Sequence, residues 1–191
     1  MKEMFEVRWH GRGGQGAVTA AELSVYAAIE EGKYAQAFPS FGPERRGAPV
    51  VAFSRFSDKP ILIRSDIYNP DMIIVLDPTL FKNVNVMEGL KANGIAVVNT
   101  SKPAEDIIKR YNFPGNIKLG VVNATRIAMD ILRMPIVNTA MLGSFVKATG
   151  IVKLETIINV VKRRFRGAAG EKNAEAVRRA YNETVFVGGD G

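Results

Sequence analysis

A glycine-rich loop near the N-terminus carries the residues that are best suited to binding chemistry. The residues of this loop are Gly11, Arg12, Gly13, Gly14, Gln15 and Gly16. Glycine permits positive φ angles and lets the backbone approach a ligand closely, and a helix that begins at such a loop presents unpaired N–H groups with a partial positive charge. We therefore expect the loop to hold an anion or the backbone of a partner chain.

The spacing of three of these glycines raises the question of a dinucleotide. Gly11, Gly13 and Gly16 match the G-x-G-x-x-G pattern of such sites. An NAD site also needs an acidic residue about 20 residues further on to bind the ribose. Residues 34–38 contain no carboxylate and no arginine, which disfavours NAD(P). The alternative is that the glycines only permit tight packing of a helix on a strand, although packing alone does not require the arginine and glutamine of the loop.

A second loop combines proline and glycine with charged side chains. It covers residues 38–49, FPSFGPERRGAP, and contains Glu44, Arg45 and Arg46 between Pro43 and Gly47. Guanidinium groups in a constrained loop suit a phosphate, a carboxylate or a neighbouring subunit. The alternative is an ordinary solvated run of charges.

The sequence offers little material for catalysis. It contains one histidine, His10, and no cysteine. We predict no catalytic residue and no metal site, and we interpret His10 as a hydrogen-bonded structural residue. Without cysteine the chain has no disulfide, no thiol nucleophile and no cysteine-held iron–sulfur cluster. A redox centre therefore has to lie on another chain.

The composition is that of one globular domain, which we place over residues 1–191, since 47% of the residues are hydrophobic and 24% are charged. The formal net charge of +7 favours an anionic cofactor or an acidic protein partner. We find no motif with a clear nucleic-acid-binding signature and do not expect a nucleic acid partner. No apolar run has the length of a membrane span and the N-terminus does not resemble a signal peptide, so we expect a cytoplasmic protein without a membrane partner.

Hydrophobic patterning predicts the elements that position these residues. We expect strands at residues 5–10, 34–37, 71–77, 95–99 and 117–122, and helices at residues 17–31, 124–132, 139–148, 154–165 and 174–185. Residues 50–56 and 61–64 are predicted to pair as a hairpin. The fold class is α/β, a single Rossmann-like domain with a mainly parallel sheet, an inserted β-hairpin and a helical C-terminal part.

Four polar residues, His10, Asp77, Asn99 and Asn123, fall at the ends of predicted strands. Sheets of this kind bind ligands at the carboxyl ends of their strands. We therefore expect these side chains to line one rim, with Asp77 also as the N-cap of a helix that begins at Pro78. The apolar residues 136–152 are either a surface that needs a partner or a buried core helix.

Three segments together resemble the gamma subunit of pyruvate and related 2-oxoacid:ferredoxin oxidoreductases. They are WHGRGGQGAVTAAELS at residues 9–24, EGKYAQAFPSFGPERRGAPVVAFSRFSD at residues 31–58 and NTAMLGSFVKATGIV at residues 138–152. The resemblance spans nearly the whole chain and preserves the order of the motifs. The FGPERRGAP loop looks more like the pyruvate branch of the family than the other branches.

The resemblance implies an accessory subunit of an enzyme that decarboxylates a 2-oxoacid, passes electrons to ferredoxin and forms an acyl-CoA. It implies alpha, beta and delta subunits as partners and ferredoxin as the electron acceptor of the complex. Thiamine diphosphate, Mg and iron–sulfur clusters are then expected on those subunits, with no cofactor bound by this chain alone. We expect the isolated chain to be inactive.

Carried onto this sequence, the resemblance places residues 11–16 and 39–47 beside the active site of the alpha and beta chains. Arg12, Arg45 and Arg46 suit the phosphates of CoA, which predicts that both loops help to enclose or recognise it. Two alternatives remain open. One is the same subunit of a 2-oxoisovalerate or 2-oxoglutarate enzyme, and the other is a free-standing CoA- or mononucleotide-binding module.

Overall fold

The structure is a computed structural model, and it describes residues 4–40 and 47–189. In these ranges the strands are β1 (Phe5–Arg12), β2 (Tyr34–Pro39), β3 (Pro49–Ser57), β4 (Met72–Val75), β5 (Ile95–Asn99), β6 (Lys118–Val122) and β7 (Val185–Val187). The helices are α1 (Ala17–Glu30), α2 (Ala104–Tyr111), α3 (Ala124–Leu132), α4 (Asn138–Thr149), α5 (Leu154–Phe165) and α6 (Gly167–Glu183). A 3-10 turn, η1 (Pro78–Lys82), follows β4.

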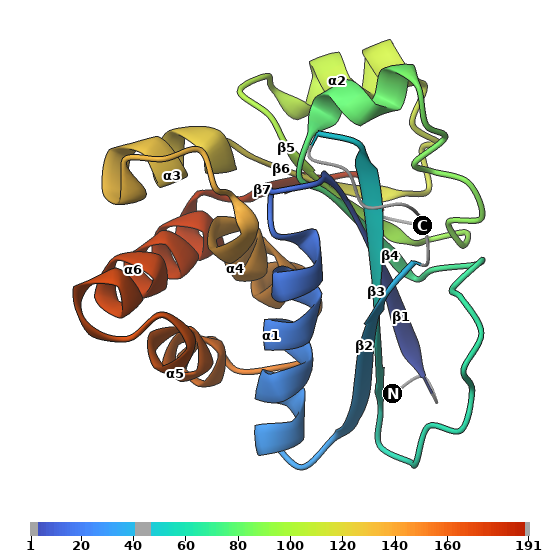
Figure 1. The fold of residues 1–191 in the computed structure, drawn as a ribbon. Helices are drawn as coiled ribbons and strands as arrows, with labels where there is room; N and C mark the ends of the chain where they lie inside the picture. The colour runs from blue at the N-terminus through green and yellow to red at the C-terminus, as the bar shows by residue number, and fades with distance from the viewer. Residues whose placement is uncertain (1–3, 41–46, 190–191) are drawn as a thin grey trace.

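The strands form a sheet of seven in the order β2-β3-β1-β4-β5-β6-β7 (Figure 1). Strands β1, β4, β5 and β6 run parallel and make its centre, and β2, β3 and β7 are antiparallel to their neighbours. The central runs MIIV and AVVN are buried throughout, as expected for strands covered on both faces. The predicted α/β class with a Rossmann-like parallel core and C-terminal helices is confirmed.

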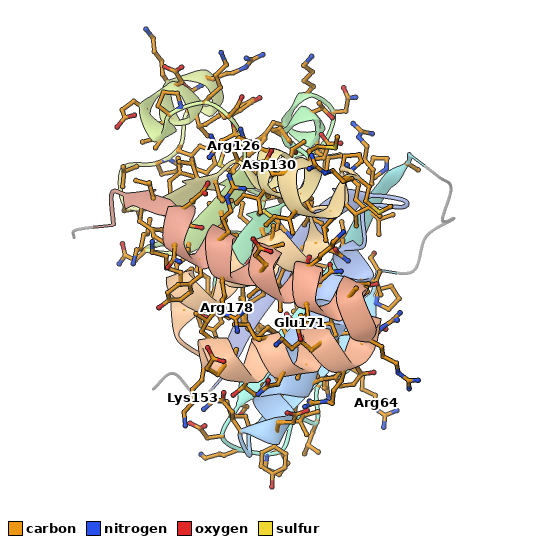
Figure 2. The ribbon with its side chains drawn as sticks, turned by 90° about the vertical axis from the view of Figure 1, so that its left-hand side faces the viewer. Arg64, Arg126, Asp130, Lys153, Glu171 and Arg178 are labelled. Atoms are coloured by element: carbon orange, nitrogen blue, oxygen red, sulfur yellow. The ribbon has the colours of Figure 1, made fainter. Side chains whose placement is uncertain are left out.

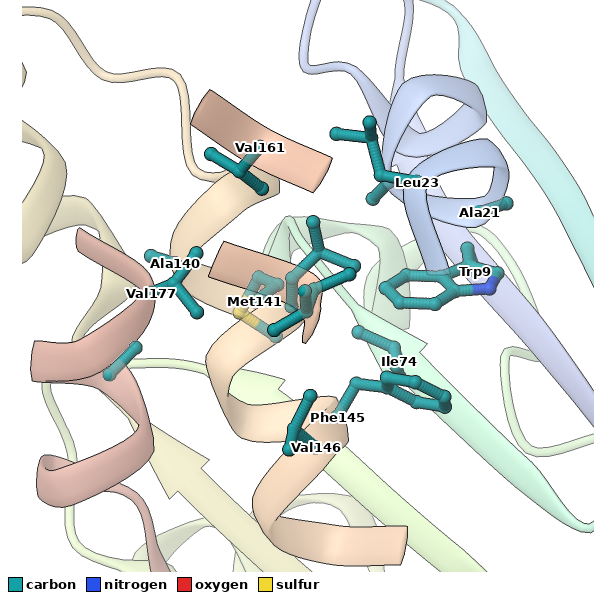
Figure 3. Packing of buried hydrophobic residues seen from close by; sticks show 14 of the residues in the cluster. Trp9, Ala21, Leu23, Ile74, Ala140, Met141, Phe145, Val146, Val161 and Val177 are labelled. Carbon is teal, nitrogen blue, oxygen red and sulfur yellow. The ribbon is translucent and has the colours of Figure 1, made fainter. Parts of the chain in front are cut away.

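Helices cover the two faces of the sheet unequally. On one face, α1 and α4 lie against the strands and α5 and α6 pack outside them, whereas α2 and the loop regions lie on the other face (Figure 1). Trp9 is fully buried in the larger core, where its ring centroid lies 5.6 Å from that of Phe145 (Figure 3). Phe145 also stacks on Phe56 at 5.5 Å. Burial of such aromatic pairs anchors α4 on β1 and β3.

Helix α4 answers one question that the sequence left open. Met141, Leu142 and Phe145 have no exposed surface, and the helix packs against α1, α6 and the sheet (Figure 3). The segment is therefore a buried core helix and not a partner surface. Gly143 lets α4 approach α6 closely, because a Cβ at this position would lie 2.1 Å from the carbonyl oxygen of Val177.

Residues 50–56 form a strand as predicted, but this strand, β3, pairs with β2 and not with residues 61–64. Strand β3 pairs with β2 on one edge and with β1 on the other, so residues 61–64 have no edge to join and form a loop. Arg55, which is 1% exposed, fixes this loop by donating hydrogen bonds to the carbonyl oxygens of Ile63 and Ser65 at 3.4 and 2.7 Å. Its Nε donates to Glu6 at 2.9 Å. The prediction of a strand at residues 61–64 was wrong.

Candidate functional site

The turn after β4 and the loop after β1 are joined by a carboxylate. Asp77 Oδ2 accepts hydrogen bonds from Arg12 Nε at 3.0 Å and from Gln15 Nε2 at 3.1 Å. Asp77 Oδ1 accepts from the backbone N–H and the hydroxyl of Thr79 at 2.9 and 2.6 Å, so Asp77 caps η1 as predicted. One carboxylate thus holds the two polar side chains of the glycine loop and the start of η1.

Arg12 has a structural role in this network. Its Nη1 donates to the carbonyl oxygen of Gly47 at 3.1 Å and its Nη2 donates to Thr79 Oγ1 at 2.9 Å, in addition to the bond with Asp77. The backbone amide of Arg12 is held by Gln15 Oε1 at 2.7 Å. The guanidinium therefore uses each of its three nitrogens within the protein and fixes the shape of the loop.

The described C-terminal end of the second loop, Gly47 and Ala48, lies beside the glycine loop. The backbone N–H of Gly13 donates to Ala48 O at 2.9 Å, and the N–H of Gly47 donates to Gly13 O at 3.1 Å. Glu44, Arg45 and Arg46 lie outside the residues that the structure describes. Gly47, which follows them in the sequence, is bonded directly to the glycine loop.

The glycines of the first loop serve different purposes. Gly14 has φ +94°, and a Cβ added there would have no atom within 4 Å, so this glycine meets a conformational need. A Cβ at Gly16, where φ is +79°, would lie 2.5 Å from Asn138 Nδ2, and one at Gly11 would lie 3.2 Å from Ala17 Cβ. Packing of α1 therefore explains Gly11, and at Gly16 packing against α4 adds to the need for a positive φ. Both contacts agree with the alternative interpretation of the loop.

The electrostatics of Asp77 favour its charged form. Partial burial on its own would raise the pKa of this carboxyl, but hydrogen bonds from Thr79 and Gln15 and the charge of Arg12 outweigh that effect and lower the pKa below its ordinary value. The carboxylate consequently stays ionised at neutral pH and keeps both loops in place.

His10 does not reach the rim, although its sequence position suggested that it would. Strand β1 continues to Arg12, so His10 lies within the sheet and is 3% exposed. Its Nε2 accepts a hydrogen bond from Arg8 Nε at 2.9 Å. Desolvation, and secondly the charge of Arg8, lower the pKa of His10 to about 3. His10 is a neutral structural residue.

Asn99 and Asn123 do lie on the expected rim. Both line a cavity of about 870 Å³ at the carboxyl ends of the strands, which Thr79 of the network above also lines. Sequence reasoning did not identify the cations of this cavity, which are Lys82, Lys102, Lys109 and Arg110. They come from three separate places in the sequence and follow no motif, so only the positions of the two asparagines at strand ends pointed to this place.

Comparison with known proteins identifies the family. A sequence profile described as pyruvate ferredoxin/flavodoxin oxidoreductase matches residues 6–183. The chain belongs to this family. The resemblance to the gamma subunit that the three motifs indicated is thereby confirmed, and the chain is a gamma-type oxidoreductase subunit by sequence and fold.

Curated relatives of similar length carry consistent names. The chain is 56% identical over 183 residues to the pyruvate/ketoisovalerate oxidoreductases common subunit gamma of Thermococcus kodakarensis, covering 95% of this chain and 98% of the relative. It is 51% identical over 180 residues to the pyruvate synthase subunit PorC of Methanothermobacter thermautotrophicus, covering 94% and 96%.

A solved structure has the same fold. The crystal structure of pyruvate oxidoreductase subunit PORC from Thermotoga maritima is similar with a TM-score of 0.86 and 42% identity, over 97% of this chain and 99% of that one. Within residues 4–40 and 47–189, none of the helices is both long and apolar enough to span a membrane. The same ranges hold no group of three or more His, Asp or Glu side chains arranged to bind a metal ion.

Proposed function

We propose that the chain is the gamma subunit of a thiamine diphosphate-dependent pyruvate:ferredoxin oxidoreductase, where it helps to close the active site and to recognise CoA. The complex converts a 2-oxoacid, CoA and oxidised ferredoxin into an acyl-CoA, CO2 and reduced ferredoxin. Alpha, beta and delta subunits supply the catalytic centre and the electron path. The isolated gamma chain is inactive in this proposal, since it has no cysteine for a cluster and its histidine is buried.

One observation supports the role in CoA recognition more than any other. The glycine loop and the end of the Glu44–Arg46 loop are hydrogen-bonded to each other through Gly13, Gly47 and Ala48 at the carboxyl edge of β1. Ligands of open α/β sheets bind at this edge. The glycine loop and residues 47–48, which are separated by more than 30 residues in the sequence, therefore lie together at this edge.

The chemistry of this surface fits the phosphates of CoA. Arg45 and Arg46 belong to the second loop and supply two guanidinium groups. Each guanidinium can donate two parallel hydrogen bonds to the oxygens of one phosphate. Arg12 is engaged with Asp77, Thr79 and Gly47, so its part in recognition is to position the loops. The arginines of the second loop are then the residues that contact the ligand.

Kinetics of the assembled complex test this proposal. Replacing Arg45 and Arg46 with Gln is expected to raise the KM for CoA by about tenfold or more, because charge-assisted hydrogen bonds are lost, while assembly and the KM for the 2-oxoacid stay unchanged. Lys153→Gln with Arg178→Gln removes the same charge from the layer of α5 and α6 and serves as the matched control (Figure 2). An unchanged KM for CoA in the loop variant refutes the role.

The choice of pyruvate over other 2-oxoacids rests on the names of relatives and on the FGPERRGAP loop. The name of the Thermococcus relative joins pyruvate and ketoisovalerate enzymes through one common subunit. A chain of this type shared between two complexes would co-purify with two sets of partner subunits. Activity assays on the purified material with pyruvate, 2-oxoisovalerate and 2-oxoglutarate distinguish these cases.

A further inference from the structure

The cavity at the carboxyl ends of β5 and β6 has the size of a ligand site. Its volume is about 870 Å³, within the range of about 300–1,000 Å³ that small-molecule sites occupy. Its walls come from η1, from the turn after β5, from α2 and from the start of α3. The glycine loop, residues 11–16, contributes none of its lining residues.

The cavity concentrates positive charge. Among the described residues that line it, four side chains are cationic and one, Asp106, is a carboxylate. The four cations are Lys82, Lys102, Lys109 and Arg110. In the part of the chain that the structure describes, none of these five groups takes part in an ion pair, whereas Arg12, Lys91 and Arg179 each pair with a carboxylate. Unpaired cations around a hollow attract an anion.

The polar floor of the cavity is rigid. Asn99, which is buried, donates from Nδ2 to Leu76 O at 2.8 Å and to Thr125 Oγ1 at 2.9 Å, and its Oδ1 accepts from the backbone N–H of Thr125 at 3.2 Å. Asn123 caps α3 by accepting from the N–H of Arg126 at 2.9 Å. The amide of Asn99 thus has its partners within the protein, and the cations that line the cavity form no ion pair with a described residue that would withhold them from a ligand.

The wall also offers groups other than charges. Thr79, Thr100 and Ser101 bring hydroxyls that can donate to phosphate oxygens, and Tyr111 brings aromatic surface beside the buried Ile107. Tyr111 is fixed by stacking on Phe81 with ring centroids 4.2 Å apart. A ligand that carries phosphate groups on a larger, partly apolar body fits this combination better than an inorganic ion does.

We infer that this cavity is a site for the phosphate groups of a nucleotide. Lys102, Lys109 and Arg110 would contact the phosphates, and Tyr111 would face the nucleoside. Two sources share this chemistry, the phosphoadenosine end of CoA and a free nucleotide. Thr79 lies in the cavity wall and also accepts from Arg12, which makes the site continuous with the glycine loop. Only the choice of CoA as the source rests on the proposed function.

Binding to the purified full-length chain tests the site directly. Isothermal titration with ADP, 3′,5′-ADP and inorganic pyrophosphate compares the wild type with the triple variant Lys102→Gln, Lys109→Gln and Arg110→Gln. The three side chains are exposed and form no ion pair with the described residues, and the Arg110 guanidinium lies over the ring of the adjacent Tyr111 at 5.6 Å. The variant is therefore expected to fold with a nearly unchanged melting temperature. The control triple variant is Lys153→Gln, Lys172→Gln and Arg178→Gln, with Lys153 just before α5 and the other two residues on α6. Figure 2 labels Lys153 and Arg178.

If the site exists, ADP or 3′,5′-ADP binds the wild type and the control variant with the same Kd. The Kd of that nucleotide for the cavity variant is expected to be higher by about tenfold or more. Equal binding by all three proteins, an equal loss in both variants, or no binding to the wild type would overturn the inference. Binding of pyrophosphate as tight as that of ADP would also overturn it, since the nucleoside would then contribute nothing.

The two sources give different results in the assembled complex. If CoA is the source, the cavity variant raises the KM for CoA and 3′,5′-ADP competes with CoA. If a free nucleotide is the source, ADP binds the cavity while the KM for CoA is unchanged. The proposed role of the second loop is tested separately by the Arg45 and Arg46 variant, so each idea can fail without the other.

Discussion

Asp77 accepts a hydrogen bond from Arg12 at 3.0 Å and thereby fastens the turn after β4 to the loop after β1. The same arginine reaches Gly47, which lies just before the start of β3. Three segments from distant parts of the chain therefore meet at one charged pair. This arrangement gives the glycine loop a defined shape at the edge of the sheet where ligands of such folds bind.

Replacing Asp77 with Asn is expected to loosen this edge. The amide of Asn would set a donor against the donors of Arg12 and Gln15, so we expect the free energy of unfolding at pH 7 to fall by about 1–3 kcal/mol. In the folded protein the pKa of Asp77 lies below its ordinary value of 3.8. The stabilisation by ionised Asp77 is therefore fully present above pH 3.8 and is lost as the pH falls through the folded-state pKa. Urea denaturation of both proteins at pH 7 and at pH 3 measures it.

A surface carboxylate provides the control for this experiment. Asp58 pairs with Lys33 at 3.6 Å and its side chain is 57% exposed, so Asp58→Asn is expected to change stability by about 0.5 kcal/mol or less. Equal effects of the two substitutions at pH 7 would show that the Asp77 network does not hold the loops.

Burial of His10 makes the free energy of unfolding depend on pH between pH 5 and pH 7, above the range in which carboxylates ordinarily titrate. In the fold its pKa is about 3, against an ordinary value of 6.5, so below pH 6.5 the unfolded chain binds a proton that the native protein excludes. The contribution of His10 to the free energy of unfolding is fully present above pH 6.5 and decreases as the pH falls towards the folded pKa. Between pH 7 and pH 5 this contribution decreases by about 2 kcal/mol.

Two measurements check this behaviour of His10. As the chain has one histidine, its imidazole proton resonances are assigned without ambiguity, and they should not titrate between pH 5 and pH 8. His10→Gln keeps an acceptor for Arg8 and removes the ionisation, so its stability should change less than that of the wild type between pH 7 and pH 5. An imidazole that titrates near pH 6.5 in the folded protein would contradict the buried, neutral state.

Close contact between α4 and α6 predicts a strong effect at Gly143. An added methyl group would lie 2.1 Å from Val177 O and 2.8 Å from the backbone nitrogen of Tyr181, so the helices must move apart. We expect Gly143→Ala to lower the free energy of unfolding by about 1–3 kcal/mol or more. Gly115→Ala, where no atom lies within 4 Å, should leave the thermal midpoint nearly unchanged. Equal midpoints would show that the helices are not in tight contact.

Much of the fold could be predicted from hydrophobic periodicity, because the strongest patterns belong to the most buried elements. Strand β5 and helices α3 and α5 have the predicted limits. The segment at residues 61–64 was predicted as a strand because local pattern does not reveal that β1 and β2 occupy both edges of β3. Strand β7 was taken as the end of a helix, since three residues carry too little pattern to separate the two.

The site was less predictable than the fold. The sequence indicated the glycine loop, Asp77 and the asparagines at strand ends, because glycine spacing and strand ends leave local signals. The engagement of Arg12 with Asp77 and the gathering of the cations around the cavity depend on tertiary contacts that no local pattern encodes. The position of His10 was missed because β1 continues two residues beyond it.

The most direct test of the central claim is anaerobic affinity purification from the native host with a tag on this chain, followed by mass analysis and visible absorption of the eluate. We predict a brown complex that contains three further subunits and thiamine diphosphate and reduces ferredoxin with pyruvate and CoA. A colourless protein that elutes alone and binds CoA would contradict the subunit role and favour a free-standing binding module.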